Sequence, residues 1–369
     1  MKIICKMIIT FIILSSTLLN TQAYNLEIKD INPSGFYKDK DMLYIVDDYT
    51  NKIYQYYQDE LTFIAGHENI IFNVPRGGLI NGLAKYSLFN EPFMAVPWNG
   101  GIVVSDTNNH MLRYIKDGIT STYAGSLTPG YVDKDLDSSL FYLPKGLAID
   151  NDGNLLVADT GNGVIRKITK DGTVSTYIDG LQAPVGLCWS ENALYITDVV
   201  SNQIFKFESD QLKVVSGIAN EINGEWIAGF DDGSLNEATF NCPEGIYVEN
   251  DIIYVADTGN GAIRRIYDNT VETIYQSDLL VMPTGIVIYE GKMIIGDSFS
   301  KKYITLNSDE FLPKKEVEQD ENSESQLPTT QRVDENNSNA LFIGIISGIC
   351  LVLIGVFLVK KFRKKQDNI

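Results

Sequence analysis

One octapeptide, Asp-Thr-Gly-Asn-Gly-Val-Ile-Arg at residues 159–166, returns almost unchanged at residues 257–264. A segment this long and specific that recurs within one chain marks a structural repeat, and a repeat restricts the fold more than any local pattern does. Looser copies follow short apolar runs elsewhere in the chain, which gives six units. The first residues of the six motifs are Asp47, Asp106, Asp159, Asp198, Asp257 and Asp297.

A proline precedes each motif aspartate by fourteen residues, or by fifteen in the third unit. Proline is tolerated at the first residue of a strand because it donates nothing to the hydrogen-bond ladder. A glycine follows two residues later in five units and allows neighbouring backbones to approach closely, whereas the second unit has Met94. The prolines are Pro33, Pro92, Pro144, Pro184, Pro243 and Pro283.

Each unit reads as four short strands joined by tight turns. In the third unit, apolar runs at 147–149, 155–158, 164–168 and 174–178 are separated by turn sequences such as Asp150-Asn151-Asp152-Gly153. Asp-Gly between apolar runs is a strong hairpin signal, because glycine supplies positive φ. Four antiparallel strands repeated six times predict an all-β fold, a six-bladed β-propeller over residues 24–312.

The sixth unit lacks a clear fourth strand, although a ring must join its first and last blades. Residues 26–30 stand before Pro33 much as residues 176–179 stand before Pro184. We therefore expect this N-terminal segment to supply the outer strand of blade six. The alternative is a strand at Phe311-Leu312.

Three connections between units are long and cover about residues 66–91, 125–143 and 217–242. Each insert has a glycine fourteen residues before the following proline and a phenylalanine three before it, which predicts one shared loop design with the phenylalanines packed inward. Loops on a rigid scaffold are where binding usually resides, so the insert face is the expected binding face. The paired residues are Gly78 with Phe89, Gly130 with Phe141, and Gly229 with Phe240.

The octapeptides, together with Asp106-Thr107-Asn108-Asn109-His110-Met111-Leu112-Arg113, resemble NHL repeats, which are named for an Asn-His-Leu run. The arginines Arg113, Arg166 and Arg264 belong to this motif, and units one, four and six have Tyr54, Phe205 and Ile304 there. Residues 194–198, Leu-Tyr-Ile-Thr-Asp, are also similar to the YWTD propeller motif. The resemblance implies a binding platform, although relatives include lyases and lactonases, and fold alone does not choose between them.

Aromatic and acidic insert residues are the candidate binding residues. Aromatic side chains anchor interfaces and stack on sugars. The alternative for Trp226 is that it fills its own loop. The candidates are Trp226, Phe230, Asp231, Asp232, Tyr131 and Asp133. We expect a non-enzymatic scaffold for binding, adhesion or sensing that takes a protein, peptide or glycan.

Residues for catalysis or metal binding are few. The chain has only His67 and His110, and one carboxylate, Glu244, follows directly after a blade proline. Asp150–Gly153 lacks the glutamate that closes a calcium loop, and 133–137 reads as a charged loop tip. We expect no catalytic residue, metal or cofactor. The alternative is a membrane-anchored ectoenzyme, a lyase or lactonase-like hydrolase with a metal in the central channel.

Both ends of the chain predict export and anchoring. Residues 1–23 have two lysines, an apolar run and small residues before Ala23, as in a cleaved signal peptide. Residues 313–339 are polar without an aromatic and predict a flexible stalk. The uncharged run 340–359 matches the length of a membrane helix, and the basic tail 360–369 places that end in the cytoplasm. Gly344 and Gly348 form a small-residue pair of the kind that lets two such helices associate weakly.

One motif allows a different anchor. Leu327-Pro328-Thr329-Thr330-Gln331 is similar to a cell-wall sorting signal of Gram-positive bacteria, except that Gln331 stands where glycine is expected. We favour a retained membrane helix, and hence a single-pass protein whose ectodomain faces the exterior of the plasma membrane. Wall anchoring is the alternative if the degenerate motif is used.

Charge and cysteine content restrict the partners and the cross-links. The formal charge is −18; the signal contributes two positive charges and the tail a net four, so residues 24–339 carry −24. An acidic surface repels phosphate backbones, which argues against nucleic acid as a partner.

The positions of the cysteines argue against a disulfide between them. When the inner strands of their blades are aligned by the repeat, Cys188 and Cys242 differ by about five residues in height along the strand. This offset, roughly 17 Å, exceeds the reach of a disulfide, so we expect the two not to pair.

Overall fold

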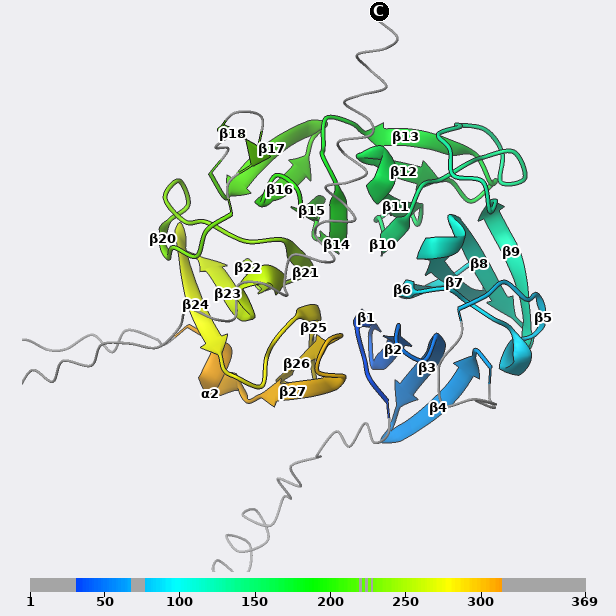
Figure 1. The fold of residues 1–369 in the computed structure, drawn as a ribbon, viewed down its shortest axis with the longest axis horizontal. Helices are drawn as coiled ribbons and strands as arrows, with labels where there is room; N and C mark the ends of the chain where they lie inside the picture. Colours follow the sequence, from blue (N-terminus) through cyan, green and yellow to red (C-terminus); the bar gives the residue numbers. More distant parts are fainter. Residues whose placement is uncertain (1–30, 68–76, 219–220, 223–224, 227, 314–369) are drawn as a thin grey trace, which may run out of the picture.

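The computed structural model describes residues 31–67, 77–218, 221–222, 225–226 and 228–313. Six antiparallel sheets stand around a central axis like the blades of a propeller (Figure 1). In each blade the strands follow the chain outward from the axis, and each strand pairs with the next one in sequence. The predicted six-bladed β-propeller is confirmed.

The first three blades begin close to the first three repeat prolines. Blade one contains β1 (Gly35–Asp39), β2 (Met42–Asp47), β3 (Lys52–Tyr57) and β4 (Glu60–Ala65). Blade two contains β6 (Pro92–Trp98), β7 (Gly101–Asp106), β8 (Met111–Lys116) and β9 (Ile119–Gly125). Blade three contains β10 (Pro144–Ile149), β11 (Leu155–Asp159), β12 (Val164–Ile168) and β13 (Val174–Ile178).

The other three blades repeat this order. Blade four contains β14 (Pro184–Ser190), β15 (Ala193–Asp198), β16 (Gln203–Glu208) and β17 (Gln211–Ser216). Blade five contains β21 (Pro243–Glu249), β22 (Ile252–Asp257), β23 (Ala262–Tyr267) and β24 (Thr270–Gln276). Blade six contains β25 (Pro283–Tyr289), β26 (Lys292–Asp297) and β27 (Lys302–Leu306).

Apolar residues fill the spaces between neighbouring blades. The second strand of a blade is buried on both faces, as β11 shows, where all five residues are buried. One core cluster joins Val96 and Val103 of blade two to Leu147 and Leu155 of blade three. Burial on both faces explains why these strands read as continuous apolar runs rather than as alternating ones.

The repeat glycines of the inner strands allow the blades to converge on the axis. A β-carbon on Gly146 would lie 2.1 Å from the Val185 carbonyl oxygen, and one on Gly186 would lie 2.1 Å from that of Glu244. Neither glycine has a positive φ, so glycine is required at these positions because a larger side chain would not fit, and not because of the backbone conformation. The close approach expected of these glycines is confirmed.

The inserts continue the outer edges of the blades that follow them. In the first insert, β5 (Gly82–Leu83) pairs with β9 and precedes the 3-10 turn η1 (Ala84–Tyr86). In the third, β20 (Gly233–Ser234) pairs with β24, and β18 (Glu221–Ile222) pairs with β19 (Glu225–Trp226). In the second, Asp135 forms an isolated bridge with Thr173. Phe89, Phe141 and Phe240 are fully buried, as predicted.

The junction between blades one and six differs in part from the prediction. The expected closing strand at 26–30 lies outside the described residues. The alternative at Phe311-Leu312 is wrong, because Ser308–Phe311 forms the helical turn α2 with an Asn307 and Glu310 capping box. Phe311 is buried against Tyr254, with 5.9 Å between ring centroids. The Thr284 hydroxyl donates to the Ser34 carbonyl at 3.2 Å and links the two blades.

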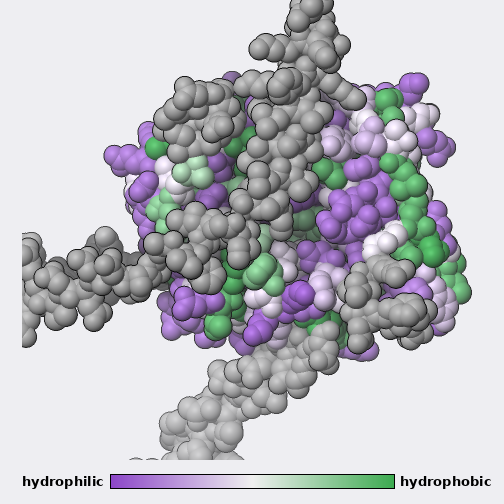
Figure 2. Space-filling model, in the orientation of Figure 1, coloured by the Kyte–Doolittle hydropathy of each residue, from purple (hydrophilic) through white to green (hydrophobic). Residues whose placement is uncertain are grey.

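Hydrophilic residues cover much of the face seen in Figure 2, and apolar residues gather at its right edge over β5 and β9. Leu83 and Ile119, which pair across those strands, are 55% and 46% exposed. Within the described ranges, no helix has both the length and the apolar character needed to cross a membrane. The predicted signal peptide, membrane helix and basic tail lie outside those ranges, as does the stalk beyond Pro313.

Candidate functional site

The motif aspartates hold the start of each inner strand. All six are buried, and one carboxylate oxygen of each accepts a backbone amide one or two residues before the blade proline. Asp159, for example, accepts the amide of Tyr142 at 2.7 Å. Aspartate suits this role because its short side chain reaches nearby backbone donors. The predicted scaffold role of these aspartates agrees with these contacts.

The second carboxylate oxygen is used in two ways. In blades one, four and six it accepts amides of its own turn, as Asp198 does from Val200 and Ser201. In blades two, three and five it accepts an asparagine side chain and an arginine, as Asp257 does from Asn260 and Arg264. The arginine motif therefore defines a distinct class of blade.

In these three blades the arginine joins the blade to its insert. Arg264 donates to Asp257 at 2.8 Å, to the carbonyls of Thr239 and Asp231, and to the Asp232 carboxylate at 2.7 Å. Its guanidinium lies between the rings of Phe240 and Phe230, at 5.0 Å and 5.1 Å. Arg113 and Arg166 make equivalent contacts with the first and second inserts. We call each such set an arginine clamp.

The arginine clamps explain which repeats are degenerate. Inserts precede only blades two, three and five, and these are the blades with arginine. Tyr54, Phe205 and Ile304 occupy the arginine position in the blades without an insert. Both the inserts and the arginines are visible in the sequence, but the contact between them was not predicted. The signal for it is that an insert and an arginine occur in the same three units.

Four of the predicted binding residues belong to the clamps. The rings of Tyr131 and Phe230 lie over Arg166 and Arg264 and remain 53% and 40% exposed. Asp133 pairs with Arg166 and accepts the amide of Thr176, and Asp232 does the same with Arg264 and Thr273. These contacts are sufficient to account for both acids without a ligand.

The two remaining candidates also lie in the third insert. Asp231 accepts the Thr239 hydroxyl at 3.0 Å and offers its carbonyl to Arg264. Trp226 lies on β19, in register with Glu221 of β18. The structure therefore distributes the predicted binding residues over two inserts, and all those with described side chains have internal partners.

The histidines occupy separate places. His110 has a left-handed backbone after the 3-10 turn η2 (Thr107–Asn109), and its Nδ1 accepts the Leu143 amide at 3.3 Å. Burial lowers the pKa of His110. The ring of His67 lies 6.3 Å from that of Tyr86. Among the residues with described positions, no three His, Cys, Asp or Glu side chains gather in a way that could hold a metal ion.

Cys188 and Cys242 do not pair, as predicted, because Cys188 is a free thiol.

On the insert side of the channel, side chains from different blades contact each other. Lys145 pairs with Glu244 at 3.6 Å, and its ammonium lies 4.9 Å from the centre of the Phe93 ring. Ala183, Val185 and Val199 form a small apolar cluster with Phe93 and Cys242.

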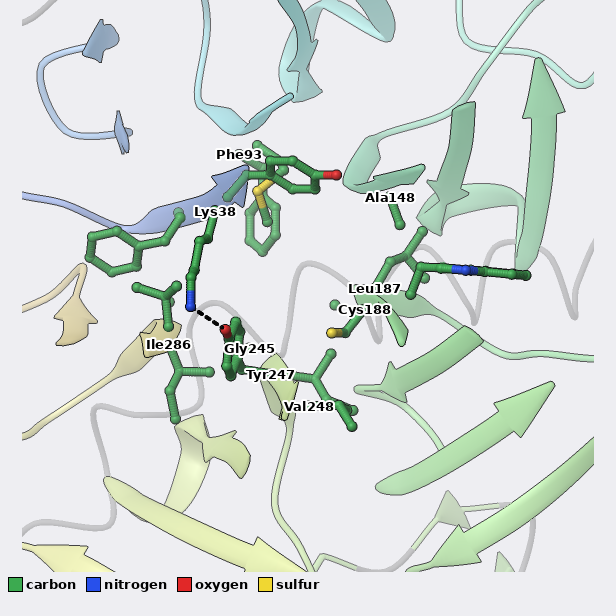
Figure 3. Close-up of a pocket in the computed structure, with 18 of the residues that line it drawn as sticks. Lys38, Phe93, Ala148, Leu187, Cys188, Gly245, Tyr247, Val248 and Ile286 are labelled. Carbon is green, nitrogen blue, oxygen red and sulfur yellow. Dashed lines mark hydrogen bonds between the residues drawn. The ribbon is translucent and has the colours of Figure 1, made fainter. Parts of the chain in front are cut away.

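On the opposite side, the channel opens into a cavity of about 340 Å³, which we call the channel pocket. Inner strands of all six blades line it, from the repeat glycines to the turns between the first and second strands. Figure 3 shows Cys188 and Leu187 on the side of the pocket opposite Lys38, with Tyr247 and Val248 of β21 below them. Apolar contributors include Phe93, Met94, Leu187, Val248 and Ile286. The channel pocket was not predicted from the sequence, because the residues that line it come from strands that are up to more than 200 positions apart.

A polar cluster lies on one wall of the channel pocket. Lys38 donates to the Glu249 carboxylate at 3.2 Å and to the Tyr247 hydroxyl at 3.4 Å (Figure 3). Tyr247 in turn donates to Glu249 at 3.1 Å. Burial and the nearby Glu249 charge raise the pKa of Tyr247, which keeps its hydroxyl protonated. One cation, one anion and one neutral donor are thus held side by side in the pocket wall.

Cys188 and Trp189 lie on blade four, in another wall of the pocket. Burial raises the pKa of the Cys188 thiol to about 11, so the thiol is protonated at neutral pH. The Trp189 indole donates to the Asn151 side chain at 2.9 Å, which fixes its ring. A wider hollow of about 840 Å³ beside blades one and two shares Tyr37 and Ile149 with the channel pocket.

A family model matches two of the blades that have an arginine clamp. The family model described as NHL repeat matches residues 141–168 and 240–266, which cover the two octapeptides in blades three and five.

Curated relatives match parts of the chain. SUPPRESSOR OF QUENCHING 1, a chloroplastic protein of Arabidopsis thaliana, is 26% identical over 266 residues, 62% of this chain and 24% of the relative. NHL repeat-containing protein 2 of Bos taurus is 29% identical over 163 residues, 36% of this chain and 22% of the relative. The chain thus spans about a quarter of the length of these relatives.

Solved structures share the fold. A streptogramin B lyase aligns with a TM-score of 0.51 at 19% identity, over 77% of this chain and 96% of its own. An auxiliary nutrient binding protein of Bacteroides thetaiotaomicron aligns with a TM-score of 0.53 at 12% identity, over 74% of this chain and 68% of its own. The solved structures share the fold, and the family model identifies NHL repeats in blades three and five of this six-bladed β-propeller.

Proposed function

We propose that this chain is a non-catalytic binding protein that holds a small amphipathic ligand in the channel pocket. The observation that carries the proposal is a cavity of about 340 Å³ that apolar side chains and the Lys38–Tyr247–Glu249 cluster line together. Ligand sites in proteins are typically apolar cavities of ~300–1,000 Å³ in which a few polar groups fix orientation.

The protonation states in the pocket support binding over catalysis. A nucleophilic cysteine needs a lowered pKa, whereas burial raises that of Cys188 to about 11. Tyr247 also has a raised pKa, and its hydroxyl is already bonded to Glu249. Neither group is poised to give up a proton near neutral pH.

An ectoenzyme is the competing proposal, because a streptogramin B lyase has the same fold. A lyase or lactonase-like reaction in the channel would call for a bound metal. Elemental analysis of the purified protein separates the two proposals: stoichiometric zinc or calcium would favour the enzyme.

The insert face carries a second proposal, the binding of a protein, peptide or glycan. The exposed rings of Tyr131 and Phe230 favour it, since each presents a surface on its clamp. Replacing Trp226, Tyr131 and Phe230 together by alanine should weaken capture of surface partners. Unchanged capture would remove this face from consideration. The cell-surface location remains part of the proposal and rests on the two ends of the sequence.

The channel-pocket proposal is tested with an uncharged probe, 2-phenylethanol. Binding should change the fluorescence of Trp189, which lines the pocket. Cys188→Trp should abolish binding by filling the cavity, whereas Cys188→Ser, a substitution of matched size, should preserve it. If wild type fails to bind, or if Cys188→Trp binds as well as wild type, the proposal is wrong.

A further inference from the structure

The mouth of the channel pocket is ringed by six turns, each of which joins the first and second strands of a blade. They comprise residues 40–41, 99–100, 150–154, 191–192, 250–251 and 290–291. Six acidic residues lie in them against one base, Lys40, and two further acids, Asp39 and Glu249, end the strands that lead into the first and fifth turns. The acids are Asp39, Asp41, Asp150, Asp152, Glu191, Glu249, Asp251 and Glu290. We call this set the acidic ring.

The turns at the other end of the channel differ. The connections between the second and third strands, residues 48–51, 107–110, 160–163, 199–202, 258–261 and 298–301, carry one acid and one lysine, Asp48 and Lys301. The acidic ring is therefore a property of the turns at the pocket mouth and does not follow from the repeat pattern. A cleft with one sign of charge at its mouth concentrates ligands of the opposite sign.

Inside the mouth, one acid, two lysines (Lys38 and Lys40) and several aromatic residues line the pocket. Glu249 belongs to both the acidic ring and the polar cluster, and its side chain is 35% exposed. Tyr37, Tyr247 and Trp189 line the same cavity. Carboxylates and aromatic rings are the groups that bind ammonium ions in proteins.

We propose that the ligand of the channel pocket is an organic cation, an ammonium group attached to an apolar or aromatic body. This inference rests on the proposed binding function and names the class of ligand. The ammonium group binds at Glu249 near the mouth, and the body fills the apolar interior between Met94, Leu187 and Ile286. Lys38 competes with the ligand for the Glu249 carboxylate.

A carboxylate ligand fits the same geometry less well. Lys38 is the base in the polar cluster, and it is already paired with Glu249 at 3.2 Å. An anion would have to separate that pair or bind Lys40, which stands between Asp39 and Asp41, and in either case pass the acidic ring. Charges within a Debye length, about 8 Å at physiological salt, act on a ligand at the mouth.

The test compares three probes of similar shape: 2-phenylethylamine as the cation, 2-phenylethanol as the neutral form and 3-phenylpropanoate as the anion. Calorimetry with the full chain at low salt should rank the amine first, by about tenfold over the alcohol. This advantage should shrink as salt is added, because screening weakens the acidic ring.

Two substitutions test the roles of the polar cluster. Glu249→Gln should remove the advantage of the amine over the alcohol. Lys38→Met should tighten amine binding, because it frees the carboxylate. The control, Asp137→Asn, removes the same charge from an exposed residue of the second insert and should leave the ranking unchanged.

The outcomes separate the two proposals. Equal binding of amine and alcohol, or tightest binding of the propanoate, overturns the cation proposal and leaves the binding function standing. Weaker amine binding by Lys38→Met contradicts its assigned role as a competitor and also overturns the cation proposal. Failure of all three probes to bind wild type overturns the binding function itself.

Discussion

Arg264 donates a hydrogen bond of 2.8 Å to Asp257, and both side chains are fully buried. The pair joins the second and third strands of blade five, and the other end of the guanidinium holds the third insert. A buried ion pair costs desolvation, which is offset only when further hydrogen bonds satisfy the charges. The terminal guanidinium nitrogens of Arg264 meet this condition through four hydrogen bonds, whereas its buried Nε has no partner among the described residues. The arginine clamps attach the inserts to the body of the propeller.

Arg264→Met should destabilise the protein by about 3–5 kcal/mol, because it leaves Asp257 buried without a cation. The free energy of unfolding in urea measures the loss. The matched control is Lys206→Met, which breaks a surface pair with Glu208 that is partly exposed on both sides. That change should cost no more than about 1 kcal/mol. Similar losses for the two variants would contradict the importance of the clamp.

Gly146→Ala should destabilise the propeller by displacing the inner strand of blade four. The added β-carbon would lie 2.1 Å from the Val185 carbonyl oxygen, a distance that no real contact reaches. A lower melting temperature is expected, with a loss of about 1–3 kcal/mol, as for other overpacked interiors. Ala148→Gly, which removes a methyl group two residues further along the same strand, should lower the free energy of unfolding by less. A melting temperature equal to wild type would show that the blades can separate freely.

Asp48→Asn should increase stability at neutral pH. Burial and the adjacent Asp47 raise the pKa of Asp48 to about 7, and its Oδ1 has no hydrogen-bond partner among the described residues. A carboxyl group whose pKa is raised by folding destabilises the protein once it ionises. This loss of stability develops as pH rises from the unfolded pKa near 4 to the folded pKa near 7. Melting temperatures of the two proteins should therefore be closest at pH 4 and diverge toward pH 7. A constant difference across this range would contradict the pKa assignment.

Cys188 should react slowly with iodoacetamide in the folded protein. Its pKa rises from 9.0 to about 11 through burial, which leaves about a hundredfold less thiolate at neutral pH. The alkylation rate of Cys188 is obtained by subtracting the rate of the Cys188→Ser variant from that of wild type, so that the reaction of the other cysteines is removed. Unfolding in urea should restore an ordinary rate. Fast alkylation of the native thiol would show that the pocket wall is open or that the thiol is activated.

Much of the fold could be predicted because each unit repeats its own local chemistry. Proline at a strand start, Asp-Gly in a hairpin turn and apolar runs of five residues act within a few positions of each other. Phe89, Phe141 and Phe240 were predicted to lie inward from spacing alone, and they are fully buried. Phe311 shows the limit, since its place in a strand or in a helix depended on its contact with Tyr254, a residue 57 positions earlier in the chain.

The sequence by itself determined the number of blades, the roles of the motif aspartates and the positions of the inserts, because these depend on short-range spacing. Only the tertiary structure decided what surrounds the channel. Lys38 and Glu249 are more than 200 residues apart, and they form a pair because the ring brings blade one near blade five. Likewise, Asp133 and Asp232 looked available for a ligand until the fold placed buried arginines beside them. Burial of a charge requires a partner, and the identity of that partner is fixed by packing and not by sequence distance.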